Sequence, residues 1–251
     1  IGRLAQTVRG MASRIRSLLH AQQELIQGIS HDLRTPVARI RLRLELLNPG
    51  SDTQRERVEG IRRDLDELES LIDAAITYSR LNEGAITLAA EPLDLGRELR
   101  SLVEDQALLA KGIALELDLP ESLPSMSGDR SLLRRAVQNL LGNALRHARS
   151  RVEVHLQGGQ RGICIAVEDD GPGVPEAQRE RIFEPFSRLD ETRSKRSGGY
   201  GLGLAIVRRI AERHGGHISC SGSPLGGARF ALDLPAQAAP RNDSHLVTVR
   251  G

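Results

Sequence analysis

The stretch Ile29–Leu47, ISHDLRTPVARIRLRLELL, is patterned as a helix but contains a proline. Apolar residues recur through it at three- and four-residue spacings, which favours one apolar stripe along a helix. Pro36 has no amide hydrogen and its ring meets the carbonyl four residues back, so the pattern predicts a bend at His31 and Asp32. Such a bend costs about 3 kcal/mol in a plain helix and suits switching better than stability.

The apolar pattern continues on both sides of this stretch and predicts a helical hairpin over residues 1–82. NPGSDT, at Asn48–Thr53, predicts the turn because Pro and Gly interrupt helices. A second helix is expected from Val58 to Leu81, with Arg, Asp and Glu on its exposed face. A lone hairpin covers only part of each stripe, whereas two hairpins packed as a four-helix bundle close the core. The sequence therefore predicts a homodimer, and a bundle completed by another partner is the alternative.

Beyond about residue 85 the pattern changes to alternating strands and helices. Strands are expected at AITLA (85–89), IALELDLP (113–120), RVEVHLQ (151–157), GICIAVED (162–169), GHISCSG (216–222) and GARFALDLP (227–235). Helices are expected at 95–112, 129–148 and 201–216, the second of them capped by Asp129. This order predicts a two-layer α/β sandwich with a mixed sheet. Residues 236–251 have little periodicity and are expected to form a mobile tail.

The composition, 39% hydrophobic and 27% charged over 251 residues, is ordinary for a globular protein of one or two domains. The net charge of +2 and the aromatic content of 2% argue against nucleic-acid binding. CxxC and HExxH do not occur, so zinc is not expected, and Cys164 and Cys220 are expected to be buried thiols. No apolar run approaches the roughly 18 residues of a membrane span. Because the chain begins with Ile, we expect a fragment whose membrane anchor lies upstream.

Two asparagines mark the helix that Asp129 caps. Asn139 and Asn143 are four residues apart and share one face, with Arg146 and His147 one turn further on. Asn is unfavourable in the interior of a helix, so two Asn residues on one face indicate a role other than helix formation. Carboxamide oxygens that face a cleft suit Mg²⁺, and the two basic residues suit phosphate; a merely polar helix face is the alternative.

Two glycine-containing turns could bind a nucleotide. In VEDDGPGVP, Asp169 stands at a strand end, where it could accept a hydrogen bond from an exocyclic amine such as that of adenine. Gly171 and Gly173 permit close approach of the backbone, although an ordinary turn would look the same. In GGYGLGLAIVRRI, a series of glycines opens a helix and predicts an anion site; these are Gly198, Gly199, Gly201 and Gly203.

Between these turns lies IFEPFSRLDETRSKRSGG, residues 182–199. Phe183 and Phe186 are two of only three phenylalanines in the chain, and they could pin a hinge. The basic, serine-rich part that follows favours a flexible lid over phosphates, with a solvated surface loop as the alternative.

Taken together, five stretches follow one another in the order typical of the sensor histidine kinases: SHDLRTP, NLLGNALRHA, EDDGPGV, FEPFSR and GYGLGLAIV. They resemble the H, N, G1, F and G2 boxes of that family, and their joint occurrence is far more specific than any one box. The resemblance covers Ile1–Pro235 and is greatest to the RstB-type branch. Two residues depart from the family's pattern, because Asp32 stands where Glu is commoner and Tyr200 where a small residue is frequent.

The resemblance implies a dimeric four-helix bundle built from helical hairpins, followed by an α/β sandwich of the Bergerat ATP-binding type. The implied domains are the end of a HAMP-like signalling helix at 1–20, a dimerisation and phosphotransfer hairpin at 21–84, an ATP-binding catalytic domain at 85–235 and a flexible tail at 236–251. The implied location is the cytoplasmic side of a bacterial inner membrane, reached through a missing N-terminal region.

In the hairpin, the resemblance implies that His31 is the phosphoacceptor. Neutral imidazole is a good nucleophile, and a pKa near 6.5 keeps it mostly neutral at pH 7. Asp32 could accept a hydrogen bond from Nδ1–H, which leaves Nε2 free, and could take the proton during transfer. Thr35, one helical turn beyond His31, is associated in this family with dephosphorylation of the partner regulator; a structural role before the bend is the alternative.

In the ATP-binding domain, the resemblance implies that Asn143 is the Mg²⁺ ligand, supported by Asn139. Arg146 and His147 would contact phosphates, and Asp169 would accept from the adenine amine. The remaining nucleotide-binding positions implied by the family are Gly171, Gly173, Gly199, Gly201, Leu202 and Gly203.

The expected activity is ATP- and Mg²⁺-dependent autophosphorylation of His31, followed by transfer to an Asp of a response regulator of the OmpR type. Most of the catalysis would be positioning and charge neutralisation. One alternative is a Bergerat ATPase of another class, such as a gyrase, MutL or heat-shock chaperone domain, although the hairpin argues against it. The other is a non-enzymatic dimeric scaffold, which the retained polar groups of all five boxes disfavour.

Overall fold

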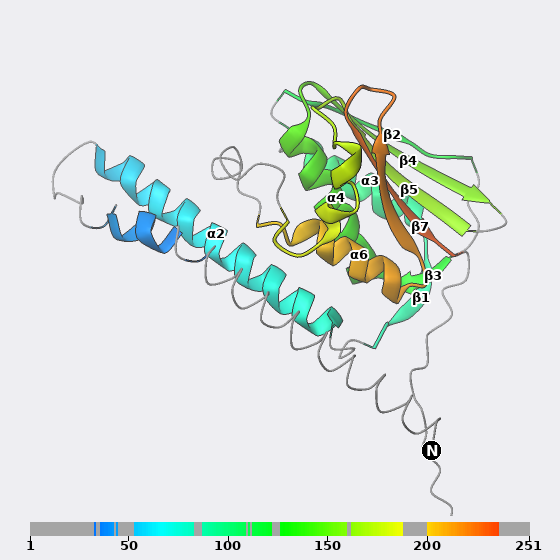
Figure 1. Cartoon of the computed structure of the whole chain (residues 1–251), viewed down its shortest axis with the longest axis horizontal. Helices are drawn as coiled ribbons and strands as arrows, with labels where there is room; N and C mark the ends of the chain where they lie inside the picture. The colour runs from blue at the N-terminus through cyan, green and yellow to red at the C-terminus, as the bar shows by residue number, and fades with distance from the viewer. Residues whose placement is uncertain are drawn as a thin grey trace, which may run out of the picture.

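The computed structural model describes residues 33, 36–42, 44, 53–82, 87–108, 110, 112–121, 126–159, 162–187 and 200–235. Residues 36–42 are helical and lie beside the first half of the long helix α2 (Thr53–Asn82) (Figure 1). Arg39 pairs with Asp64 at 3.1 Å and also with Glu67, which fixes this part of the hairpin. The predicted bend at His31 lies outside the described residues.

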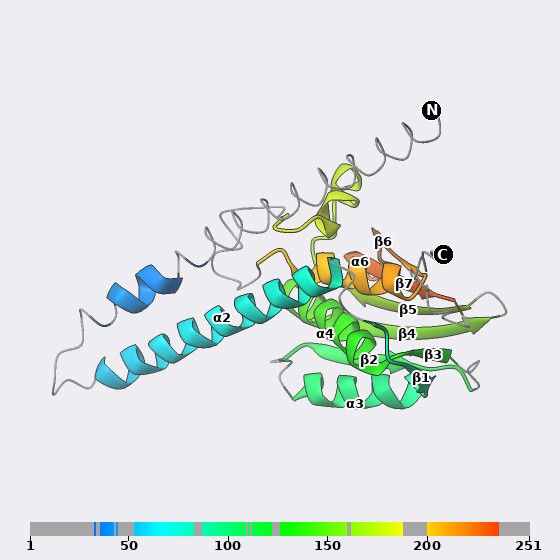
Figure 2. The same ribbon diagram turned by 90° about the horizontal axis from the view of Figure 1, so that it is seen from below.

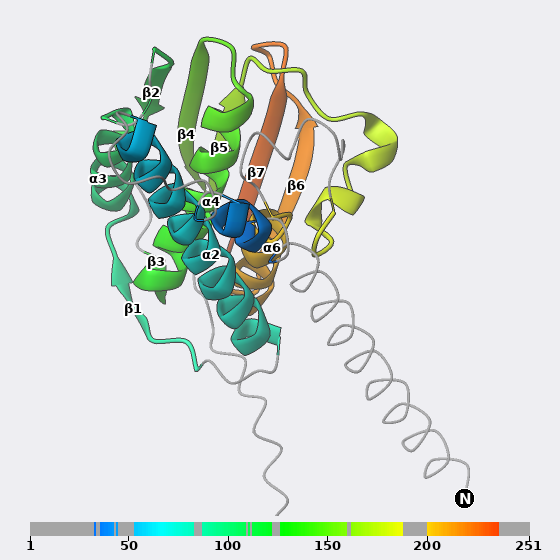
Figure 3. The ribbon, with the colours of Figure 1, turned by 90° about the vertical axis from the view of Figure 1, so that its left-hand side faces the viewer.

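The rest of the described chain forms an α/β sandwich. Its elements are β1 (Ala90–Leu93), α3 (Leu95–Ala107), β2 (Ala114–Asp118), β3 (Met126–Asp129), α4 (Arg130–His147), β4 (Arg151–Gly159), β5 (Gly162–Asp169), the short 3-10 turns η1 (Glu176–Gln178) and η2 (Arg181–Phe183), α6 (Gly203–Arg213), β6 (His217–Gly222) and β7 (Ala228–Leu234). Five strands form one sheet in the order β2-β4-β5-β7-β6, and β1 pairs with β3 (Figure 3). Only the β2–β4 pairing is parallel among these strand pairs, so the predicted mixed sheet is confirmed.

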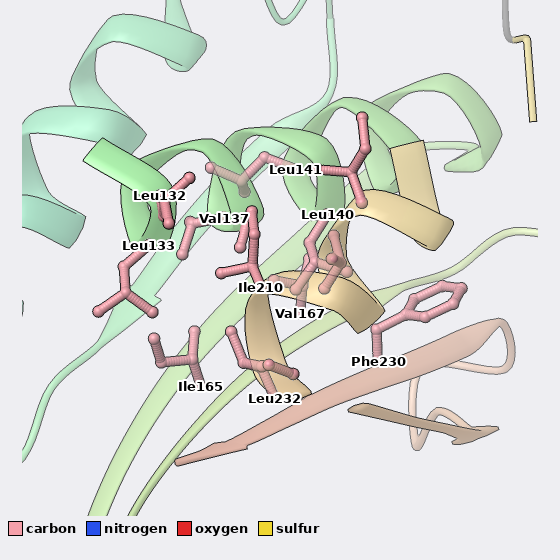
Figure 4. Close-up of a cluster of buried hydrophobic side chains, with 14 of the residues drawn as sticks. Leu132, Leu133, Val137, Leu140, Leu141, Ile165, Val167, Ile210, Phe230 and Leu232 are labelled. Carbon is pink, nitrogen blue, oxygen red and sulfur yellow. The ribbon is translucent and has the colours of Figure 1, made fainter. Parts of the chain in front are cut away.

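The core lies between the sheet and the helices α4 and α6 (Figure 4). In β7 every second residue is buried, because successive side chains point to opposite faces of a strand. On the helix side, α4 contributes leucines such as Leu133 and Leu140, and α6 contributes Ile206 and Ile210. Full burial of each such side chain stabilises the fold by about 1.5–3 kcal/mol. The core needs few aromatic residues because aliphatic side chains fill it.

The sequence prediction is wrong for two strands and for the end of one helix. The strand predicted at residues 85–89 is misplaced, because residues 87–89 are not in a strand and β1 begins at Ala90, which pairs with Asp129 of β3. That partner, Met126–Asp129, is short and has no clear alternation, so the sequence did not indicate it. Helix α3 ends at Ala107 rather than at Gly112, and Leu108 just beyond it is 88% exposed, so no apolar contact extends the helix.

Two polar groups fix the junction of β3, α4 and α6. Asp129 caps α4 as predicted, because its carboxylate accepts from the amide of Leu132 at 3.1 Å. The fully buried His214 accepts from the amide of Asp129 through Nε2 at 3.0 Å and donates from Nδ1 to the carbonyl of Ile210 at 2.8 Å. Burial lowers the pKa of His214 below its ordinary value, so the ring is held neutral in this position.

The cysteines are unpaired and lie on β5 and β6. Both are partly exposed, so the expectation of buried thiols is wrong; Cys164 lies opposite Asp233 in the sheet, on the other face from Ile163 and Ile165. Burial nevertheless raises the pKa of both thiols to about 11, which disfavours the reactive thiolate.

Helix α6 packs against the second half of α2 (Figure 2). Leu71, Ala75, Tyr78 and Leu81 of α2 are buried. Helix α4 is also joined to α2, by an ion pair in which Arg135 lies 2.8 Å from Asp73. Within the described part of the chain, no helix is both long and apolar enough to cross a bilayer.

Candidate active site

Asp169 ends β5 and lies at the centre of a tight backbone cradle. Its side chain is buried, with only 1% of the residue exposed, and Oδ1 accepts from the amides of Gly171 at 2.8 Å and Ala228 at 3.2 Å. Both hydrogen bonds found for this carboxylate among the described residues fall on Oδ1, so Oδ2 is left for another donor. A buried carboxylate oriented in this way suits a fixed amine donor.

Two glycines make this arrangement possible. A Cβ at Gly171 would lie 2.5 Å from the carbonyl oxygen of His147 and 2.8 Å from Asp169 Oδ1. A Cβ at Gly227 would collide with the same oxygen and would lie 2.5 Å from the amide nitrogen of Gly171. Gly173 has a φ of 72° and packs on the carbonyl of Gly227, so both turns depend on missing side chains.

Asp170, the next residue, has a structural role. Its carboxylate accepts from the amides of Arg149 at 2.7 Å and Ser150 at 3.0 Å and from the hydroxyl of Ser150 at 2.6 Å. These hydrogen bonds, led by the one from the Ser150 hydroxyl, hold the pKa of Asp170 far below its usual range. Asp170 thereby holds the turn that follows α4 against the turn that carries Asp169.

Helix α4 presents the two predicted asparagines. Asn139 and Asn143 are both partly buried, and they lie on one face as their spacing predicts. The Nδ2 atom of Asn139 is buried without a hydrogen-bond partner among the described residues. A Cβ at Gly203 would lie 3.6 Å from Asn139 Oδ1, so this carboxamide faces the start of α6. An unsatisfied buried amide beside a helix N-terminus is a place where a polar ligand fits.

Arg146 and His147 form the last turn of α4, and both are exposed. Partial desolvation lowers the pKa of His147, and the positive charge of Arg146 lowers it further. The carbonyl of His147 adjoins Gly171, so these basic residues stand beside the Asp169 cradle.

The start of α6 is the place where the sequence predicts an anion site. Leu202 occupies the N-cap position, and among the described residues no side chain caps the first-turn amides. Uncapped amides at a helix N-terminus attract anions such as phosphate, and the anion site expected here stays a prediction.

Gly201, just before α6, is held by the phenylalanine segment. Its φ is 70°, its carbonyl accepts from the amide of Phe186 at 2.9 Å, and a Cβ would lie 2.8 Å from the Phe186 backbone. Phe186 itself has a φ of 61°, which is uncommon for a residue with a side chain. Phe183 meets Phe230 edge to face, with ring centroids 6.4 Å apart. The two phenylalanines therefore fix the segment that the sequence suggested as a hinge.

The structure thus brings together two groups of predicted residues. Asp169, Gly171, Gly173 and His147 surround one cradle, and Asn139 faces Gly203 at the start of α6. The predicted residues that lie outside the described part of the chain are His31, Asp32, Thr35, Gly198 and Gly199.

Sequence reasoning missed three features of the site. Gly227 and the amide of Ala228 complete the Asp169 cradle, and the only signal for them was the Gly-Gly pair before the last strand. Asp170 was not distinguished from Asp169, although the two play different parts. Tyr200, noted only as a departure, donates a hydrogen bond to the carbonyl of Glu67 at 2.8 Å.

Comparison with known families and structures agrees with this geometry. The family described as "Histidine kinase-, DNA gyrase B-, and HSP90-like ATPase" matches residues 128–238, and the "His Kinase A (phospho-acceptor) domain" matches residues 21–84. Sensor protein RstB of Escherichia coli K12 is 39% identical over 233 residues, which are 93% of this chain and 53% of that protein. The chain therefore spans about half the length of this relative.

Two solved structures extend the comparison. The mycobacterial sensor histidine kinase MprB is 30% identical and matches with a TM-score of 0.51 over 59% of this chain and 97% of that one. Full-length ShkA, solved in complex with AMPPNP, is 29% identical and matches with a TM-score of 0.65 over 88% of this chain and 45% of that one. The fold, the two matched families and these relatives agree that the chain belongs to the sensor histidine kinase family, as a kinase similar to RstB.

Proposed function

We propose that this chain is the catalytic portion of an ATP-dependent protein-histidine kinase that phosphorylates His31. The observation that carries the proposal is the buried Asp169 carboxylate, held in its glycine cradle with Oδ2 unengaged among the described residues. The same domain holds an uncapped, glycine-rich helix start, and the helix that follows it, α6, packs on α2 of the hairpin. An adenine-binding carboxylate and a phosphate-binding helix start are the two ends of an ATP site.

In this site, Asp169 Oδ2 accepts from the exocyclic amine of adenine. Guanine has a carbonyl at that position, so the carboxylate selects ATP over GTP. Gly171 and Gly173 admit the nucleotide, while the amides of Gly199, Gly201, Leu202 and Gly203 bind its phosphates. Arg146 and His147 contribute positive charge at the end of α4.

The donor set also fits Mg²⁺. Magnesium prefers oxygen ligands, retains several waters and is commonly held by one or two protein groups together with substrate phosphates. Asn143, supported by Asn139, supplies a carboxamide oxygen of this kind from α4. Bound there, Mg²⁺ would neutralise charge on the phosphates. The described residues contain no group of three or more His, Cys, Asp or Glu able to hold a metal ion by themselves, so the substrate phosphates would complete the site.

The reaction is an in-line displacement at the γ-phosphorus of ATP. His31 Nε2 forms the new P–N bond as the bond between the γ-phosphorus and the β,γ-bridging oxygen breaks, and ADP leaves. Asp32 accepts a hydrogen bond from Nδ1–H, which keeps Nε2 available, and takes the proton released by the imidazole. The phosphoryl group then passes to an Asp of a response regulator, which we propose is of the OmpR type.

The wider assignments follow from the same proposal. The hairpin, residues 21–84, forms a homodimeric four-helix bundle, and residues 85–235 bind ATP. Residues 1–20 end a HAMP-like helix and 236–251 form a tail. The chain acts on the cytoplasmic side of a bacterial membrane. Thr35 aligns water for hydrolysis of the regulator's phospho-Asp, which makes the protein a phosphatase as well.

The test is incubation of the chain with γ-labelled ATP and Mg²⁺. We expect protein-bound label that is lost in acid and stable in alkali, as a phosphoramidate requires. His31→Gln should abolish the label and leave binding of an ATP analogue within twofold. ATP hydrolysis without protein-bound label would instead support a Bergerat ATPase of another class. Absence of nucleotide binding would support a scaffold.

A further inference from the structure

The loop before α6 is tied to the hairpin through the hydroxyl of Tyr200. Tyr200 donates from its phenol to the carbonyl of Glu67 at 2.8 Å, and its ring is partly buried against the core. Glu67 lies within α2, where carbonyls already accept from the amide four residues on. The phenol is thus an added donor that α2 does not need in order to fold. A phenylalanine would keep the ring contacts and lose only the tie.

Tyr200 is also joined rigidly to the phosphate-binding backbone. The next residue, Gly201, is held by the amide of Phe186 at 2.9 Å and has no space for a side chain. A displacement of Tyr200 relative to α2 would therefore move Gly201 and the start of α6 with it.

A second tie holds the other end of α6. Arg213, its last residue, donates from Nε and Nη2 to the carbonyl of Leu81 at 3.2 and 3.0 Å. Leu81 lies in the last turn of α2, where carbonyls lack an intrahelical partner, so the guanidinium satisfies one of them. We call the Tyr200–Glu67 and Arg213–Leu81 contacts the clasp.

The Glu67 end of the clasp is also connected to the first helix of the hairpin. The carboxylate of Glu67 pairs with Arg39, which lies 3.1 Å from the largely buried Asp64 as well. Arg39 is three residues beyond Pro36, the residue for which the sequence predicts a bend. A change in the first helix would thus be transmitted to Glu67, and hence to Tyr200.

We propose that the clasp slows phosphorylation of His31, and that the Tyr200–Glu67 contact is the part of the clasp that can be released. This inference rests on the proposed kinase function. An ATP-binding unit tied at both ends of α6 cannot swing along the hairpin, yet it must move between phosphorylating His31 and exposing it to a regulator. Contacts that are made while the clasp is formed and lost before phosphoryl transfer raise the free-energy barrier to that transfer. The phenol of Tyr200 would restrain transfer through its contact with Glu67 of α2.

The experiment compares Tyr200→Phe with the wild-type chain. Loss of one partly buried neutral hydrogen bond should raise the rate of His31 phosphorylation about three- to tenfold at saturating ATP. The Kd for an ATP analogue should stay within twofold. Without nucleotide, hydrogen exchange of amides in residues 67–81 of α2 should become about threefold faster. The matched control is Arg208→Gln, which lies on the exposed side of α6 and pairs only with Glu212 among the contacts found for it.

The outcomes separate the two proposals. A faster rate, unchanged affinity and faster exchange support the clasp. A slower rate with unchanged affinity would overturn it, since Tyr200 would then hold a productive arrangement. Unchanged rate and exchange would overturn it too. If neither wild type nor variant takes up label, the kinase proposal fails, and the exchange measurement still decides whether the tie exists.

Discussion

A side chain at Gly227 would occupy the position of the Asp169 carboxylate. A Cβ there would collide with Asp169 Oδ1 and would lie 2.5 Å from the amide nitrogen of Gly171. The amide of Ala228, one residue on, donates to the same Oδ1 at 3.2 Å. The start of β7 therefore fixes the orientation of the carboxylate at the end of β5, so residues almost 60 positions apart in sequence build one cradle.

Gly227→Ala should abolish this orientation. The new methyl group meets backbone atoms as well as the carboxylate, so the turn at Asp169 must shift. We expect ATP affinity to fall at least about tenfold, which is about 1.4 kcal/mol of binding free energy. Overpacking should also cost about 1–3 kcal/mol of stability. Calorimetric titration with an ATP analogue and thermal unfolding would measure the two effects.

The matched control is Gly222→Ala at the end of β6, because a Cβ there meets nothing within 4 Å. It should leave ATP affinity unchanged. Equal affinity for the wild type and Gly227→Ala would mean that the cradle does not orient Asp169 for the ligand.

Asp169→Asn should remove selectivity for adenine and keep the cradle. The carboxamide retains one oxygen to accept from the amides of Gly171 and Ala228, while the oxygen available to the ligand is replaced by an amine. ATP affinity should fall about tenfold or more, GTP affinity should be spared relative to it, and the melting temperature should change little. Titrations with both nucleotides test this. A uniform loss for ATP and GTP would remove the adenine-binding role.

Asn143→Ala should weaken nucleotide binding mainly when Mg²⁺ is present. The reason is the proposed role of its carboxamide oxygen, which would bind the ion rather than the base. We expect at least about fivefold loss of affinity with Mg²⁺ and less than twofold without it. Gln138→Ala, at an exposed position of the same helix, is the control and should be neutral in both conditions. Equal losses with and without Mg²⁺ would contradict a ligand role for Asn143.

Much of the fold was predictable because its signals are local. The periodicity of apolar residues predicted α4 and α6, and their alternation predicted β4, β5 and β7. Asp129 correctly indicated where α4 begins. The candidate site was predictable where one motif holds the whole feature, as at Asp169 with Gly171 or at the glycines before α6.

What the sequence did not indicate depends on contacts between distant segments. Strand β3 exists through its pairing with β1, and Gly227 matters only because β7 begins beside the end of β5. The Tyr200–Glu67 contact joins residues 133 positions apart, so a one-residue departure from the family pattern carried no clue to its partner. Such features become visible only once the tertiary arrangement is known.

His214 connects three elements through a neutral ring. Its Nε2 must be unprotonated to accept from the amide of Asp129, and burial lowers its pKa from the ordinary value of 6.5. The unfolded chain therefore binds a proton at a higher pH than the folded protein does. The stability that the neutral ring contributes is complete above pH 6.5 and is lost progressively as the pH falls from there towards the lowered pKa.

His214→Leu should make this pH dependence disappear at a cost in stability. Without the ring, the buried amide of Asp129 loses its acceptor, which should destabilise the protein by about 1–3 kcal/mol at pH 8. Between pH 6.5 and 5 the wild type should lose more stability than the variant does, so the two curves should approach each other. Urea unfolding at several pH values measures this, with His217→Gln on the exposed start of β6 as the control. Parallel curves for the wild type and His214→Leu would show that protonation of His214 does not limit stability in acid.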